Sequence, residues 1–164
     1  MLFRSIAAAP AHFLRAGIGD AIAKKYEAVG CMAGTGLTPF GTRPLLTALA
    51  IADCAHATIL RHAEAALAAC EAGAITPDLE HVVEAVVLMS GLGFENGGLS
   101  LAHSLTRGLV RARGARDAIH GAQVAWAALV HMAAEGRGDD DIQSLARFYR
   151  RIGLPVRLAD LGMA

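Results

Sequence analysis

The sequence predicts an all-α domain, a helical bundle, and three observations favour this class. Ala, Leu, Val and Ile dominate the composition while aromatic residues make up only 5% of it, a balance that suits close-packed helices better than sheets. Apolar residues recur at helical spacing, and no segment of useful length alternates as a strand does. The 164 residues suffice for one substantial core. We therefore expect a single helical domain over residues 1–164.

The first half of the chain contains two expected long helices. One begins after Pro10 and extends to about Ala28, with an interruption at Gly17 and Gly19. Clustered glycine and proline predict a surface loop over residues 29–43. A long amphipathic helix then follows from about residue 44 to residue 70, because its apolar residues recur on one face.

The middle of the chain combines a clear helix start with a glycine-rich segment. Thr76 as N-cap and Pro77 as first helical residue predict a helix that runs to about Ser90. The glycines of residues 91–98 predict a tight connection in which backbone rather than side chain approaches a ligand. A helix over residues 99–110 then carries a histidine on an apolar face.

Two further helices complete the prediction. One opens near His120 and ends around Glu135. The other has three aspartates at its start, residues 139–141, and arginines in its last turns before Gly153, which matches the polarity of the helix dipole.

Charge and cysteine content exclude several classes of protein. Fifteen basic and fifteen acidic side chains cancel, so nucleic acid and membrane lipid are not expected as partners. The arginines of residues 107–116 are interpreted as a solvated loop rather than a phosphate site. No run is long enough for a membrane span or a signal peptide, which predicts a cytoplasmic location. Cys31, Cys54 and Cys70 lack CxxC spacing and are expected to be buried, apolar residues.

Seven histidines suggest a metal site, because neutral imidazole is a common ligand and Asp can complete a three-ligand set. His103 lies on an apolar helix, where burial would keep it neutral. His120 lies at a helix start, where the dipole disfavours protonation. Taken singly, each histidine is more often a core residue, and Asp20 is more often a helix cap. These residues alone indicate a helical domain without a defined activity.

Several segments together resemble the C-terminal domain of glycerol dehydrogenases, in the iron-containing alcohol dehydrogenase superfamily, a helical domain shared with dehydroquinate synthase-like proteins. The resemblance covers nearly the whole chain from about residue 7. It implies a catalytic divalent metal, zinc or iron, held by Asp20, His103 and His120, and a substrate pocket lined by Phe94. The matching segments are Ala16–Ala21, Val82–Ala85, Ser90–Leu99, Ala102-His103, His120-Gly121 and Gly153–Pro155.

The resemblance implies an NAD-dependent oxidoreductase that oxidises a small polyol such as glycerol, the hydride passing to NAD. Such enzymes carry an N-terminal NAD-binding domain. We expect that domain to be absent here, so that a truncated or split chain depends on a separate nucleotide-binding chain and forms homo-oligomers. Ala122 and Gln123 replace a Glu and a Lys of the family, and Thr106 replaces a second His. A non-catalytic metal-binding or assembly remnant, and a dehydrogenase of another small diol, therefore remain alternatives.

Overall fold

The computed structural model describes residues 2–163, and every regular element in that range is a helix. The predicted all-α class is therefore confirmed. The elements are α1 (Leu2–Ala7), α2 (Ala11–Ala33), α3 (Leu46–Glu71), α4 (Pro77–Glu84), the π-helical stretch η1 (Ala85–Met89), α5 (Ser90–Gly97), α6 (Leu101–Leu109), the 3-10 turn η2 (Ala115–Asp117), α7 (His120–Ala134), α8 (Asp139–Ile152) and the 3-10 turn η3 (Leu158–Leu161).

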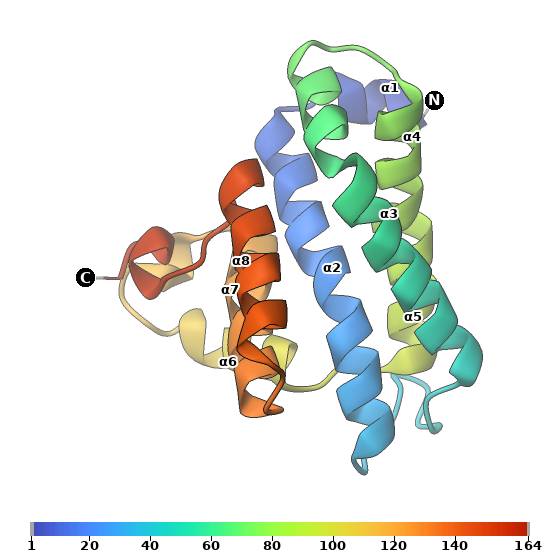
Figure 1. Cartoon of the computed structure of the whole chain (residues 1–164), viewed down its shortest axis with the longest axis vertical. Coiled ribbons are helices and arrows are strands. Elements are labelled where there is room, and N and C mark those ends of the chain that lie inside the picture. The colour runs from blue at the N-terminus through green and yellow to red at the C-terminus, as the bar shows by residue number, and fades with distance from the viewer. Residues whose placement is uncertain (1, 164) are drawn as a thin grey trace.

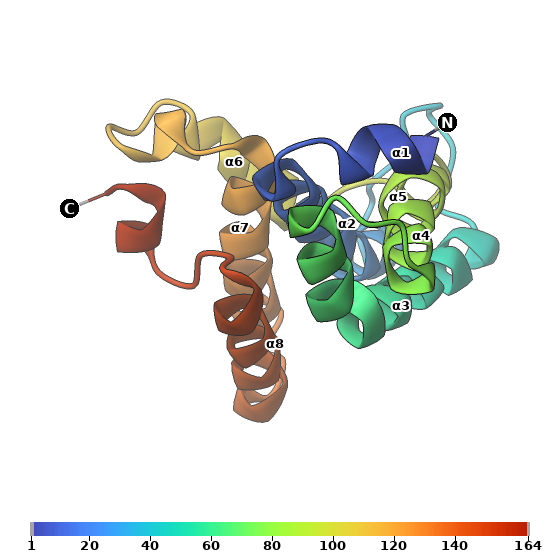
Figure 2. The same cartoon turned by 90° about the horizontal axis from the view of Figure 1, so that it is seen from above.

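Helix α2 is the centre of the bundle. On one side it packs against α3 and α5, and on the other against α7, which in turn contacts α6 and α8. Figure 2 shows the same division from above, with α1 crossing over one end of the α2, α3 and α4 group. Because α2 has neighbours on both sides, its side chains can meet residues that lie a hundred positions further along the chain.

The core fixes α2 in this central position. Ile18 and Ile22 of α2 are fully buried, together with Ile59 of α3, Leu79 of α4 and Tyr149 of α8. Burying one such side chain contributes roughly 1.5–3 kcal/mol. A helix held by several of them is a rigid support for a functional group.

Helix α2 corrects the predicted interruption at Gly17 and Gly19. The helix is continuous from Ala11 to Ala33, five residues beyond the predicted end. A Cβ at position 17 would lie 2.8 Å from Val86 Cγ1, and one at position 19 would lie 2.5 Å from the Gly121 carbonyl oxygen. The glycines therefore allow neighbouring helices to approach, and Asp20 lies inside the helix instead of capping it.

Residues 91–97 of the glycine-rich segment are also helical, contrary to the predicted tight connection. Helix α4 continues through η1 into α5, which ends only at Gly97. Gly98 then adopts a positive φ of 77°, a conformation that glycine takes without strain. At Gly97 an added Cβ would lie 2.9 Å from Ala28 Cβ, so the small residue permits close packing of α5 against α2.

Residues that predict where a helix starts or ends were interpreted more accurately than the glycines. Thr76 Oγ1 accepts a hydrogen bond from the Leu79 N–H, 3.3 Å away, as expected of an N-cap. Helix α8 ends at Ile152, and Gly153 takes the left-handed conformation that closes it. Cys31 and Cys70 are buried as predicted, but Cys54 is exposed, so the interpretation of that cysteine was wrong.

No single helix among the described residues has both the length and the apolar character to cross a bilayer. One bent pair, Pro77–Gly97 with Leu101–Leu109 at 101° to each other, has sufficient length and hydropathy only when the two are taken together.

Candidate metal centre

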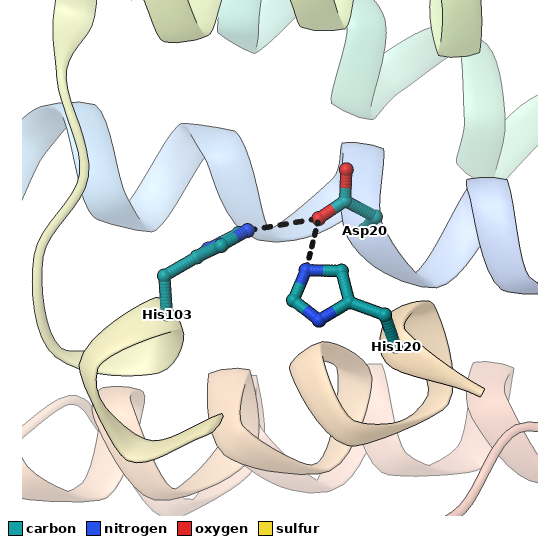
Figure 3. A group of neighbouring side chains, drawn as sticks. All are labelled: Asp20, His103 and His120. Atoms are coloured by element: carbon teal, nitrogen blue, oxygen red, sulfur yellow. Dashed lines mark ion pairs between the residues drawn. The ribbon is translucent and has the colours of Figure 1, made fainter. Parts of the chain in front are cut away.

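Three side chains from three helices converge at one point. Asp20 projects from α2, His103 from α6 and His120 from α7 (Figure 3). Asp20 Oδ1 lies 3.0 Å from His103 Nε2 and 3.9 Å from His120 Nε2, and one ligand atom from each residue lies within 4.8 Å of the others. No other group of three His, Cys, Asp or Glu side chains in the range 2–163 is arranged in this way.

These separations suit a divalent transition metal. Bonds of about 2.1 Å in a tetrahedral arrangement place ligand atoms roughly 3.4 Å apart, which lies between the separations of 3.0 and 3.9 Å in the structure. Two imidazoles and one carboxylate also leave at least one coordination position open, as catalytic zinc sites do. The donor set therefore fits such an ion.

Close contact between two helix backbones brings Asp20 and His120 together. Gly121 of α7 faces Ala16 of α2, and a Cβ at position 121 would lie 2.5 Å from the Ala16 carbonyl carbon and closer still to its oxygen. Gly19, in the next turn of α2, also lies against Gly121, whose carbonyl oxygen would be 2.5 Å from a Cβ at position 19. Because neither glycine has a side chain, α2 and α7 cross backbone to backbone one turn from Asp20 and directly beside His120.

Glu27 is a second acidic residue at this centre, and the sequence interpretation did not single it out. Its side chain is fully buried and lies against His103 Nδ1, the ring nitrogen on the opposite side from Asp20. Asp20 and Glu27 are seven residues apart on α2, a spacing that places both on one face of a helix. That spacing was a usable signal in the sequence.

Lys24 lies on the same face of α2, between the two carboxylates. Its Nζ donates to Asp20 Oδ1 at 2.9 Å and lies 3.3 Å from His103 Nε2. A buried ammonium that contacts two of the three candidate ligands shows that this donor set already attracts a cation. A metal ion at these residues would require the Lys24 side chain to move away at least in part.

The charges of the centre follow from these contacts. Burial alone would raise the pKa of Asp20, but its hydrogen bonds with His103 and Lys24 hold that pKa well below the usual range. Burial alone would lower the pKa of His103, yet hydrogen bonds to Asp20 and Glu27 raise it. The expectation that burial keeps His103 neutral was therefore wrong for this site without a metal.

The pKa of His120 is shifted in the predicted direction. Partial burial lowers this pKa most, the charge of Asp20 opposes the shift, and the nearby His103 and Lys24 add to it. Since the side chain is still 56% exposed, His120 is the most accessible of the three candidate ligands.

A pocket of about 320 Å³ opens beside the three side chains. Its lining includes the polar side chains of Asp20, His103 and His120 and the apolar side chain of Phe94. The remaining lining residues come mostly from η1 and α5 and are Lys24, Val86, Val87, Ser90, Gly91 and Leu99. The π-helical turn η1 thus forms part of the wall, a frequent position for such turns.

The chain is 39% identical over 156 residues to a glycerol dehydrogenase of Escherichia coli O6:H1, a match that covers 95% of the chain and 42% of that protein. It is 38% identical over 158 residues to a glycolaldehyde reductase of Halobacterium salinarum, covering 96% of the chain and 43% of the relative. No family model matches the chain.

A solved structure shows the same fold. The crystal structure of a probable glycerol dehydrogenase from Sinorhizobium meliloti 1021 superposes with a TM-score of 0.95 at 39% identity, over 99% of this chain and 46% of that one. The chain corresponds to the C-terminal part of glycerol dehydrogenases. It spans less than half the length of the curated relatives that it matches.

The positions where the chain departs from the glycerol dehydrogenase pattern lie beside the site without entering it. Gln123 is buried and donates to the carbonyls of Ala115 and Ala118 at 2.8 and 3.2 Å. Thr106 Oγ1 donates to the His103 carbonyl at 2.7 Å. The two replacements therefore support the backbone that carries His103 and His120.

Proposed function

We propose that this chain is the metal-binding part of an NAD-dependent polyol dehydrogenase, with glycerol as the leading substrate. The observation that supports the proposal most strongly is the convergence of Asp20, His103 and His120 on the wall of a pocket, within a chain related to glycerol dehydrogenases. A zinc or iron ion at these residues would act as a Lewis acid that lowers the pKa of an alcohol hydroxyl.

The residues of the chain provide the remaining conditions for that chemistry. Asp20 supplies one negative charge, and the two imidazoles are neutral donors, so a bound divalent ion would keep a net positive charge. Phe94 and Leu99 line the pocket and exclude water from the side of the substrate. The volume of about 320 Å³ falls at the small end of ligand sites, about 300–1,000 Å³, as suits a small polyol.

In this proposal NAD binds to the part of the protein that the relatives carry beyond the matched region, and not to residues of this chain. The 164 residues alone should therefore form no NADH from glycerol and NAD, and turnover by that chain would contradict the assignment.

The metal assignment is tested directly by equilibrium dialysis with zinc. We expect one zinc ion per chain, and a loss of bound zinc in Asp20→Ala, His103→Ala and His120→Ala, because each removes one ligand. His62→Ala is a matched control, since His62 pairs with Asp78 and contacts none of the three. Equal zinc binding by all four variants would refute the site.

A second substrate class is favoured by one observation. A glycolaldehyde reductase matches the chain almost as well as a glycerol dehydrogenase does, at 38% and 39% identity. The competing proposal is thus a site for small hydroxyaldehydes and the corresponding diols. Ratios of kcat/KM for glycerol and for glycolaldehyde, measured on the protein together with its nucleotide-binding part, distinguish the two.

A further inference from the structure

Glu27 is a buried carboxylate whose hydrogen bonds all lead to the segment that carries His103. Oε1 accepts from the backbone N–H of Ser100 at 3.2 Å and from the backbone N–H of His103 at 2.9 Å. Oε2 accepts from His103 Nδ1. The Glu27 side chain has no exposed surface, so water does not compete for these bonds.

We propose that Glu27 is a positioning residue for the metal: it keeps a hydrogen on His103 Nδ1 and directs the lone pair of Nε2 toward the metal position. The inference rests on the proposed function, because it takes His103 to be a ligand. Glu27 itself would not contact the ion.

The ring geometry supports this role. A neutral imidazole carries its hydrogen on only one nitrogen, and the partner of the other nitrogen decides which one. A carboxylate only accepts hydrogen bonds, so Glu27 requires a hydrogen on Nδ1. Nε2 faces Asp20 Oδ1 at 3.0 Å and carries a second hydrogen in the metal-free site. It lies on the side of the ring where the other candidate ligands converge, so Nε2 is the nitrogen that would give up its hydrogen to a metal ion.

The backbone bonds support the same role at the level of the helix. His103 lies in the first turn of α6, where N–H groups have no partner within the helix. The residue at the N-cap, Ser100, makes no capping bond with its side chain. Glu27 supplies the missing acceptor from α2, the helix that also carries Asp20. One carboxylate therefore fixes the main chain, the ring orientation and the tautomer of the same ligand.

Glu27→Gln tests which ring nitrogen of His103 carries the hydrogen, because Gln has nearly the same shape as Glu but can donate as well as accept hydrogen bonds. The Gln carbonyl satisfies two backbone donors only when it takes the place of Oε1. Its NH₂ group then faces His103 Nδ1 and donates to it, which requires the hydrogen to move to Nε2. That nitrogen loses the lone pair needed for a metal, while the fold keeps its packing.

The experiment measures zinc affinity by competition with a chromophoric chelator, on the chain that binds zinc in the dialysis above. We expect Glu27→Gln to weaken zinc binding roughly 10- to 100-fold, as loss of such a partner typically does. The matched control is Asp78→Asn, which removes a carboxylate from His62 at 2.6 Å and should leave zinc affinity unchanged.

Nitrogen NMR of ¹⁵N-histidine-labelled protein supplies a readout that a purely structural role would not change. In the zinc-loaded wild type we expect hydrogen on Nδ1 of His103 and metal on Nε2. In zinc-free Glu27→Gln, at a pH where the ring is neutral, we expect the hydrogen on Nε2. The wild-type measurement remains decisive even if the variant fails to fold.

Several results would overturn the inference. Zinc on Nδ1 of His103 in the wild type excludes it directly. Unchanged zinc affinity in a folded Glu27→Gln variant excludes it while leaving the proposed metal site intact. Absence of zinc binding by the wild type removes both proposals together.

Discussion

Gly121→Ala tests whether the close crossing of α2 and α7 sets the geometry of the candidate metal ligands. The added Cβ would lie 2.5 Å from the Ala16 carbonyl carbon, whereas carbon atoms in contact are about 3.5–4.0 Å apart. The obstacle is the backbone of α2, which cannot rotate away as a flexible side chain would. Helices α2 and α7 must therefore separate by at least about 1 Å at this crossing.

The separation acts directly on two candidate ligands. His120 precedes Gly121, and Asp20 lies one turn after Ala16, so their 3.9 Å contact widens with the crossing. Metal sites tolerate deviations of about 0.2 Å in bond length. We expect zinc affinity to fall at least tenfold, equivalent to about 1.4 kcal/mol, and stability to fall by about 1–3 kcal/mol from overpacking.

The assays are zinc titration calorimetry and thermal unfolding in the presence of a chelator. Gly108→Ala is the matched control, because position 108 is also helical and an added Cβ there meets no atom within 4 Å. That variant should bind zinc normally and gain about 0.5–1 kcal/mol. Wild-type zinc affinity in Gly121→Ala would show that the helix crossing does not set the ligand geometry.

Three other perturbations have defined outcomes. Lys24→Met should tighten zinc binding about tenfold, measured by chelator competition, because it removes an ammonium 2.9 Å from Asp20 Oδ1; weaker binding would contradict this reasoning. Burial lowers the pKa of His56 from 6.5 to about 4, so the unfolded chain takes up a proton as the pH falls below 6.5 and the folded chain does not. The free energy of unfolding should therefore drop by about 3 kcal/mol between pH 6.5 and pH 4. Chemical denaturation of the zinc-free protein measures it, and the free energy of unfolding of His56→Gln should depend less on pH than that of the wild type. A His12→Gln variant, changed at an exposed histidine, is the control and should keep the wild-type pH dependence. Half-exposed apolar residues Val87 and Leu88 beside the pocket should make the purified 164 residues self-associate, which light scattering measures and a monomer at high concentration would contradict.

The helices that the sequence predicted well are those whose ends are set by local chemistry. Thr76 followed by Pro77 specifies a helix start through one hydrogen bond and one fixed dihedral angle. The aspartates at 139–141 mark the start of α8 by placing negative charge at the positive helix end, and Gly153 marks its end by adopting the left-handed conformation. These interactions join residues a few positions apart, so they are visible in the sequence without knowledge of the fold.

Glycine was misread because its local and long-range effects oppose one another. Within a helix it costs about 1 kcal/mol relative to Ala, which predicts a break at Gly17, Gly19 and the segment 91–98. In the structure Gly17, Gly19 and Gly97 allow α2 to meet η1, α7 and α5 more closely than a side chain permits. That gain depends on which helices become neighbours, so local propensity could not reveal it.

The pKa of His103 likewise could not be predicted from local sequence, because it depends on residues of another helix. Burial was expected to keep His103 neutral, and desolvation by itself does lower its pKa. The helix that buries His103, however, also presents Asp20 and Glu27 to its two ring nitrogens, and their hydrogen bonds raise the pKa instead. The two carboxylates, Asp20 and Glu27, thus stabilise positive charge on the buried His103 ring. The same carboxylates would stabilise a divalent cation, which carries a greater positive charge.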